Sequence, residues 1–154
     1  MEDKDMCFID PPWKYDDNGK LANTQLNYSL WNNNEDELDF IFKNIKTKYL
    51  FMWTTNSFVL NVMRSNHYDF IFKTIVTWVK QTDTAKLAYG MGSTFRNCTE
   101  QILIFTKKNE SLHSALRNVI MAPSGERTIK PKEWEANIFK LFINKGFDKF
   151  SYIF

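Results

Sequence analysis

The chain has 154 residues, of which 44% are hydrophobic and 25% are charged, and its formal net charge is +2. This balance is typical of one globular domain spanning residues 1–154, and no stretch approaches the roughly 20 apolar residues of a membrane span. The N-terminus lacks the basic start and apolar run of a signal peptide, so we expect an intracellular protein (cytoplasmic, or nuclear in a eukaryote) with no membrane partner. The two cysteines and two histidines show no metal-ligand spacing, which argues against a histidine-based hydrolase, and we expect no metal.

The charge is distributed unevenly along the chain. Residues 1–40 hold three basic and ten acidic side chains, a net charge of −7, whereas residues 41–154 hold seventeen and eight, a net charge of +9. The second part is therefore able to hold a polyanion. Solvated helix and loop surfaces explain the same charges equally well, so the charge permits nucleic acid binding without demonstrating it.

The first predicted elements are two strands around a loop and a helix. Residues 6–9 are apolar and predict a short buried strand, which ends at Asp10 and two prolines. Residues 14–33 are polar and predict a long loop. Residues 35–46 carry apolar side chains at helical spacing, and residues 49–53 form a continuous apolar strand suited to a covered sheet.

Helical and strand patterns then alternate. Thr54, Thr55 and Asn56 predict the N-cap of a helix. Residues 70–79 alternate β-branched and aromatic side chains and predict a strand, and residues 81–99 predict a second long loop. Two further strands are expected, at residues 101–106 and 118–121.

The C-terminal elements are a helix and a strand. Pro131 suits the first turn of a helix that carries Trp134 and ends at Gly146, and residues 147–154 predict a last strand. Strands alternating with helices indicate an α/β fold with a largely parallel sheet covered on both faces. In such sheets ligands bind at the carboxyl ends of strands, and Asp10 occupies such a position.

Asp10, Pro11, Pro12 and Trp13 form a motif with a specific chemical logic. The amine of adenine is a poor nucleophile because its lone pair is delocalised into the ring, so it must be desolvated and held in line with a methyl donor. The Asp10 carboxylate and the Pro11 carbonyl can accept its two hydrogens, while neither proline offers a competing N–H. Such acceptors supply positioning and electrostatic catalysis, and Trp13 gives the base an apolar surface. A strand that ends in a rigid proline turn, with Trp13 as a core plug, is the structural alternative.

Six segments of the chain resemble, in the same order, an adenine-N6 methyltransferase family. This family includes the catalytic subunit of the messenger-RNA adenosine methyltransferase and its bacterial and phage relatives. The matching features are Asp10-Pro11-Pro12-Trp13, Tyr28, residues 50–56, residues 77–80, the glycine-rich segment with Gly90, Gly92, Arg96 and Glu100, and residues 127–133. The likeness runs through nearly the whole chain.

The resemblance implies a Rossmann-like S-adenosylmethionine-dependent methyltransferase in circularly permuted order. Catalysis then lies near the N-terminus, with Asp10, Pro11, Pro12 and Trp13 binding the target adenine and Asp10 also near the methyl donor. Lys130 would contact the donor's methionine carboxylate. The remaining residues that the resemblance assigns to substrate binding are Tyr28, Trp53, Asn56, Lys80, Arg96 and Glu100.

Three of these assignments have simple structural alternatives. Trp53 suits the core as well as a pocket wall, Lys130 suits an ordinary surface position, and Arg96 suits an ion pair with Glu100. The charge and spacing of the residues do not separate these alternatives.

The sequence departs from the family pattern at its C-terminal end. Relatives carry a glutamate in the last strand and continue with an arginine and polar residues that hold the donor's ribose and adenine, and these do not follow residues 149–154. We therefore expect a C-terminally short fold in which donor binding is weak, other residues substitute, or a homo- or heterodimer completes the donor site.

The expected function is methyl transfer from S-adenosylmethionine to adenine N6 in DNA or RNA, without a metal or a covalent intermediate. The alternatives are a catalytically degenerate family member that binds nucleic acid or activates a partner, and a methyltransferase for another planar amine such as cytosine N4. Residues 14–33 and 81–99 are expected to be the mobile parts of the structure and to frame the substrate entrance, as long polar loops beside a site tend to do.

Overall fold

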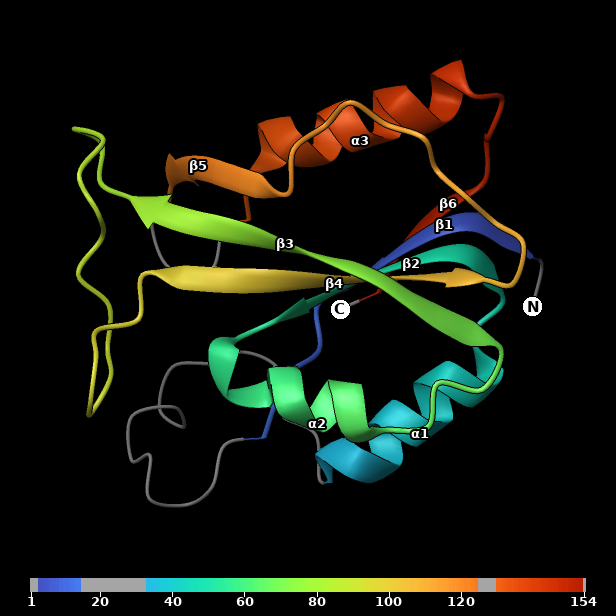
Figure 1. The fold of residues 1–154 in the computed structure, drawn as a ribbon, viewed down its shortest axis with the longest axis horizontal. Coiled ribbons are helices and arrows are strands. Elements are labelled where there is room, and N and C mark those ends of the chain that lie inside the picture. The colour runs from blue at the N-terminus through green and yellow to red at the C-terminus, as the bar shows by residue number, and fades with distance from the viewer. Residues whose placement is uncertain (1–2, 15–32, 125–129, 154) are drawn as a thin grey trace.

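A six-stranded mixed sheet forms the centre of the computed structural model, which describes residues 3–14, 33–124 and 130–153 (Figure 1). The strand order across the sheet is β5-β3-β4-β2-β1-β6. Strand β4 runs antiparallel to both of its neighbours, and all other pairs are parallel. The predicted α/β class is thus confirmed, with β4 as the exception to the parallel arrangement. The strands are β1 (Lys4–Ile9), β2 (Thr47–Thr54), β3 (Phe70–Gln81), β4 (Thr99–Lys107), β5 (Val119–Pro123) and β6 (Phe150–Ile153).

Helices cover both faces of this sheet, with α1 and α2 on one side and α3 on the other (Figure 1). Because successive residues of a strand point to opposite faces, β1 sends Cys7 and Ile9 into a core cluster with Leu38 of α1. Its Phe8 enters a second cluster with Ile138 of α3. Burial on both faces explains why β1 and β2 are continuous apolar runs. The helices are α1 (Asn34–Asn44), the 3-10 helix η1 (Asn56–Phe58), α2 (Val59–Arg64) and α3 (Lys132–Asn144).

Local sequence explains where α1 begins and where α3 begins and ends. The side-chain oxygen of Asn33 accepts hydrogen bonds from the backbone N–H groups of Glu35 (2.9 Å) and Asp36 (3.5 Å), which is the usual N-cap arrangement. Pro131 precedes α3, where its missing N–H removes no intrahelical bond. After α3, Gly146 has a φ of +87°, in the left-handed region that favours glycine, so the predicted helix end is confirmed.

The helix start predicted at residues 54–56 is confirmed in position, because the 3-10 helix η1 begins at Asn56 and leads into α2, but no side chain caps it. Thr55 precedes η1 without a side-chain capping bond, and α2 begins only at Val59. Asn56 is engaged across the sheet instead: its amide donates to the Thr99 hydroxyl (2.9 Å) and accepts from the Gln101 amide (2.8 Å). The Asn56 side chain therefore ties the start of η1 to β4.

The last strand is shorter than predicted, and it begins at Phe150. The ring of Phe147 packs instead against Phe142 of α3 and Tyr49 of β2, with centroid distances of 5.4 and 5.6 Å. Residues 15–32, which make up most of the first predicted loop and include Tyr28, lie outside the described residues. No helix in the described part of the chain is long and apolar enough to cross a membrane.

Candidate active site

Asp10 lies directly after β1, at the edge where the parallel strands end. Its backbone N–H donates to the carbonyl of Ile153 in β6 (3.1 Å), so the pairing of β1 with β6 fixes its position. Pro11 is buried, and its carbonyl accepts a hydrogen bond from the N–H of Trp13 (2.9 Å). A carbonyl oxygen has two lone pairs, so this carbonyl keeps one acceptor position.

Trp13 packs into the core next to this turn. Its ring is stacked on Phe58, with centroids 5.0 Å apart and an interplanar angle of 15°. It belongs to the core cluster on the α1 side of the sheet. The structural alternative, in which Trp13 fills the core, therefore describes the packing of this side chain. A contact between Trp13 and a base stays a prediction.

Four of the predicted site residues come together as a charged cluster, which we define as Asp10, Lys80, Glu100 and Lys130. The Lys130 ammonium lies 3.7 Å from the Asp10 carboxylate and pairs closely with Glu100, while the Lys80 ammonium lies 2.5 Å from the other oxygen of Glu100. The side chains of Lys130 and Glu100 are only 14% and 13% exposed. The surface interpretation of Lys130 is therefore wrong.

The two carboxylates of the charged cluster have opposite pKa shifts. Burial raises the pKa of Asp10, Lys130 works against this, and the nearby Glu100 adds to the rise. Burial would also raise the pKa of Glu100, but Lys130 and Lys80 outweigh it, and the net pKa is lowered. Glu100 is thus a firmly held anion, whereas Asp10 carries a negative charge that its surroundings compensate incompletely.

The buried side chain of Trp53 contacts the charged cluster. Trp53 is fully buried, and the Lys130 ammonium lies 4.7 Å from the centre of its ring, within the range of a cation–π contact. Its indole N–H donates to Glu135 of α3 (3.3 Å). Trp53 is expected from the sequence to be either a core residue or part of a pocket wall, and its burial matches the core position.

Two residues of this edge were not predicted from the sequence, Glu135 and Tyr152. Burial raises the pKa of Glu135, and the nearby Asp10 adds to the rise. Burial likewise raises the pKa of Tyr152, with contributions from Glu135 and Asp10. An acidic residue in the first turn of a helix is ordinary, because it interacts favourably with the helix dipole, so the sequence gives no signal for Glu135.

The family model described as MT-A70 matches residues 4–148. The chain belongs to the MT-A70 family. This is the family of the messenger-RNA adenosine methyltransferase and its bacterial relatives, so the resemblance seen in the sequence is confirmed. The match extends from β1 through α3 and includes every residue of the charged cluster. No curated protein sequence matches the chain.

The loop at residues 82–98 of this MT-A70 protein lies at the same sheet edge as the charged cluster. It connects the end of β3 to the start of β4, and Lys80 and Glu100 stand at its two ends. The Lys80 N–H donates to the carbonyl of Cys98 (2.8 Å), and the Ala88 N–H donates to the carbonyl of Lys80 (2.9 Å). The predicted placement of this loop beside Asp10 is therefore confirmed.

Arg96 and Asn56 occupy different surroundings within this region. The Arg96 guanidinium lies over the ring of Tyr89, 4.7 Å from its centre, inside the loop. The alternative of an Arg96–Glu100 ion pair is wrong, because Glu100 is held by the two lysines. Asn56 is bonded to β4 as described above. Residues 127–129 lie outside the described residues.

The two glycines of the loop allow its two arms to approach closely. A Cβ atom on Gly90 would lie 1.6 Å from the backbone oxygen of Asn97, and one on Gly92 would lie 1.9 Å from that of Phe95. The Asn97 N–H also donates to the carbonyl of Met91 (3.0 Å). Only glycine permits this backbone contact, which fixes the shape of the loop.

Gly92→Ala is expected to open the loop without unfolding the sheet, because the added methyl group displaces a backbone oxygen of the opposite arm. Limited proteolysis should show faster cleavage within residues 82–98, while the free energy of unfolding changes by less than about 1 kcal/mol. Ser93→Ala is the matched control and should be cleaved like the wild type. Unchanged cleavage of Gly92→Ala would show that the arms do not depend on this contact.

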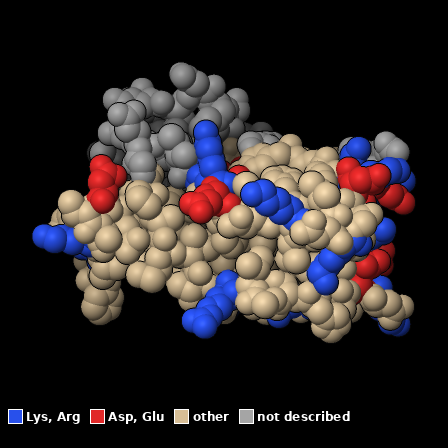
Figure 2. Space-filling model, turned by 90° about the horizontal axis from the view of Figure 1, so that it is seen from above, with Lys and Arg blue, Asp and Glu red and all other residues tan. Residues whose placement is uncertain are grey.

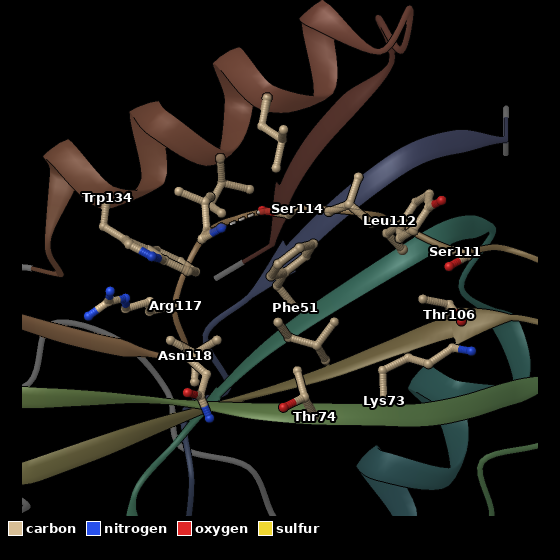
Figure 3. A pocket seen from close by; sticks show the side chains of 16 residues that line it. Phe51, Lys73, Thr74, Thr106, Ser111, Leu112, Ser114, Arg117, Asn118 and Trp134 are labelled. Carbon is tan, nitrogen blue, oxygen red and sulfur yellow. Dashed lines mark hydrogen bonds between the residues drawn. The ribbon is translucent and has the colours of Figure 1, made fainter.

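Two hollows lie on the α3 side of the protein. A groove of about 500 Å³ runs between β5 and the start of α3 and includes Lys130 in its lining. A cavity of about 240 Å³ lies between the sheet, α3 and residues 111–118; Phe51 and Trp134 line it, with Lys73 and Arg117 at opposite ends of the view (Figure 3). This cavity contains none of the predicted site residues.

The surface on the α3 side carries no continuous basic area among its described residues. Figure 2 shows lysines and arginines separated by uncharged areas and by acidic side chains. The positive charge of residues 41–154 is thus not concentrated on this face.

Proposed function

We propose that this MT-A70 protein transfers a methyl group to N6 of adenine in DNA or RNA. The observation that carries the proposal is the position of Asp10, a carboxylate with a raised pKa at the end of β1, 3.7 Å from Lys130 and next to a rigid proline pair. A group that accepts a proton from an amine works best when its pKa is raised towards neutrality. Membership of the family supports adenine as the target.

The chemistry of the proposed reaction follows from two acceptors. Asp10 and the free lone pair of the Pro11 carbonyl accept the two N–H hydrogens of the adenine amine, which directs its nitrogen lone pair towards a methyl group. Asp10 then stabilises the positive charge that develops on the nitrogen and takes the proton that it loses. In duplex DNA the base must first be flipped out of the stack, whereas a single strand avoids this cost.

The residues at this edge fit S-adenosylmethionine, which methyltransferases of this family generally use. When bound it would supply the methyl group by cleavage of its sulfur–methyl bond, whose electron pair stays on the sulfur of the departing thioether. The donor carries a carboxylate, an ammonium and a cationic sulfonium. Lys130 would hold the carboxylate, while Asp10 and Glu135 would face the cationic part. The raised pKa values of both carboxylates indicate incompletely compensated negative charge, which a cationic ligand would compensate.

We also infer that the fold is a Rossmann-like methyltransferase in circularly permuted order. The strand that carries Asp10 comes first in the chain, and β6, which pairs with it in parallel, comes last. Catalytic residues from the N-terminus and the segment around Lys130 thereby meet at one sheet edge.

A degenerate, nucleic-acid-binding or partner-activating member of the family is the second candidate. One observation favours it: Lys130 is already paired with Glu100 and Asp10, so a donor carboxylate would have to compete with these two carboxylates. A homo- or heterodimer would then supply the active site from a second chain.

A labelled-methyl transfer assay on DNA and RNA oligonucleotides, with nucleoside analysis of the product, tests the proposal. We expect label in N6-methyladenine or N6-methyladenosine. Binding of the methyl donor in calorimetry without any methyl transfer would favour the degenerate member. Label in N4-methylcytosine would show that the target is cytosine and not adenine.

The activity should depend on pH through Asp10. Only the ionised carboxylate can take up the proton that the amine loses, so kcat/KM falls as the pH falls through the pKa of Asp10, which burial places above the ordinary aspartate value of about 4. Lys130→Gln removes a charge that lowers the pKa of Asp10, so the acidic limb of the profile should move to higher pH. The matched control is Lys48→Gln, because Lys48 pairs with Asp5 at the start of β1 (2.9 Å). An unmoved limb in Lys130→Gln would contradict the assignment of the limb to Asp10.

A further inference from the structure

The loop at residues 82–98 presents apolar side chains to solvent instead of burying them. Tyr89 and Phe95 are 82% and 84% exposed, and Leu87 and Met91 are each 64% exposed. Soluble proteins rarely leave several large apolar side chains exposed together unless the surface binds something. A preformed binding surface is therefore the first explanation to test for this loop.

The loop is held in shape while it presents these rings. Directly after β3, a tight turn is held by the hydrogen bond from the Thr82 N–H to the carbonyl of Lys86 and by a bridge between Gln81 and Leu87. Further out, the close approach at Gly90 and Gly92 locks the two arms together. Tyr89 stands on one arm and Phe95 on the other, so both rings are displayed without a further cost for ordering the loop backbone.

The chemistry of the exposed side chains fits nucleic acid bases. Aromatic side chains stack on bases, and this stacking tolerates any sequence because every base has a flat face. The Arg96 guanidinium, 4.7 Å above the Tyr89 ring, adds a cation beside a stacking surface. Residues 82–98 contain Lys86 and Arg96 against the single acidic residue Asp83, so the charge of the loop also suits a phosphate backbone.

The position of the loop links it to the charged cluster. Lys80 and Glu100 stand at its two ends, and the loop projects beyond the ends of β3 and β4 (Figure 1). Nucleotides that flank an adenine placed at Asp10 would therefore lie towards the loop. In a duplex the base faces are covered by their neighbours, so rings of this kind act on unpaired bases.

We propose that Tyr89 and Phe95 form a stacking surface for the unpaired bases of single-stranded nucleic acid next to the site. The choice of ligand rests on the proposed function. The binding itself requires neither the methyl donor nor the Asp10 carboxylate.

Fluorescence anisotropy with a labelled 12-nucleotide single strand of mixed sequence, as DNA and as RNA, and with the matching duplex tests the proposal. We expect the wild type to bind the single strand more tightly than the duplex. Tyr89→Ala and Phe95→Ala should each weaken single-strand binding by about 5- to 150-fold. Tyr89→Phe should bind like the wild type, because it keeps the ring.

Phe40→Ala is the matched control, since Phe40 is 63% exposed on α1 and away from the loop. It should leave single-strand binding unchanged. The proposal is overturned if the double variant Tyr89→Ala/Phe95→Ala binds single strands like the wild type, or if it loses single-strand and duplex binding equally. It is also overturned if sedimentation shows that these variants abolish self-association while nucleic acid binding persists, because the surface would then be a protein interface.

The same proteins separate this proposal from the proposed function. Asp10→Asn should still bind single strands through the loop. If the wild type binds through the rings but transfers no methyl group, the proposed function fails and the stacking surface stands. If it methylates oligonucleotides and the ring variants bind normally, the stacking surface fails and the function stands.

Discussion

Asp10→Asn should reduce methyl transfer to below about 1% of the wild-type kcat while the protein stays folded. Loss of a positioned acceptor costs roughly two to four orders of magnitude in rate. The amide of asparagine would also turn N–H donors towards the donors of the adenine amine. Nucleoside analysis of product from a fixed-time assay, together with thermal unfolding, gives both readouts.

The stability of this variant should equal or exceed that of the wild type. A folded-state pKa above the unfolded value means that the folded protein binds the proton of Asp10 more tightly than the unfolded chain does. The wild type therefore loses stability as the pH rises from the ordinary aspartate range through the raised pKa of Asp10. Asp10→Asn has no such titration, and this contribution disappears from its stability profile.

Asp5→Asn is the matched control, because Asp5 lies on β1, the strand that leads to Asp10, and the opposite pattern is expected. Burial would raise the pKa of Asp5, but Lys48 and the backbone N–H groups of Asp148 and Lys149 outweigh it and lower the pKa. The ionised Asp5 thus stabilises the fold above its unfolded pKa, and this contribution is lost as the pH falls through the lowered folded value. Asp5→Asn should lose about 1–3 kcal/mol of stability and keep its activity.

Retention of more than a few per cent of activity in Asp10→Asn would show that Asp10 is not the acceptor for the adenine amine.

The sequence predicts strands β1 and β2 well because strands that are buried on both faces consist of uninterrupted apolar residues. Residues 49–53 are central to β2, and residues 6–9 to β1, and both strands are covered on both faces. The direction of β4 was not predictable in the same way. Its apolar pattern is the same in either direction, and the antiparallel pairing with β3 depends on the path of the loop between them.

The site shows a similar division. The motif at Asp10 is local, so its chemistry can be deduced from four adjacent residues. The pairing of Glu100 with Lys80 and Lys130 joins residues 20 and 30 positions apart, and only the folded sheet edge brings them together. The burial of Trp53 beneath Lys130, and the bond from its indole to Glu135, depend on the packing of α3 against the sheet in the same way.

Glu100→Gln should lower the stability of the protein by about 3–5 kcal/mol, the usual result of removing one partner from a buried ion pair. Lys130 and Lys80 are 14% and 26% exposed, so both ammonium groups would stay partly buried with only a neutral acceptor between them. Chemical denaturation at neutral pH measures the loss. The surface pair of Lys107 and Asp69 is the control, because Asp69 is 86% exposed and Asp69→Asn should cost less than about 1 kcal/mol.

A second substitution tests whether the loss comes from the unpaired lysines. Adding Lys80→Met to Glu100→Gln removes one buried charge and should recover part of the stability, with a coupling energy of about 0.5–3 kcal/mol. Additive losses in the double variant would contradict a shared ion-pair network.

Glu100→Gln should also move the acidic limb of the pH–activity profile, in the direction opposite to the shift expected for Lys130→Gln. Glu100 raises the pKa of Asp10 and Lys130 lowers it, so removing the charge of Glu100 lets Asp10 ionise at lower pH. The wild type also loses the stabilisation that Glu100 provides as the pH falls through its lowered pKa, whereas Glu100→Gln shows no such loss. Shifts of the two acidic limbs in the same direction would mean that Asp10 does not sense this ion-pair network, and the electrostatic account of the site would have to be abandoned.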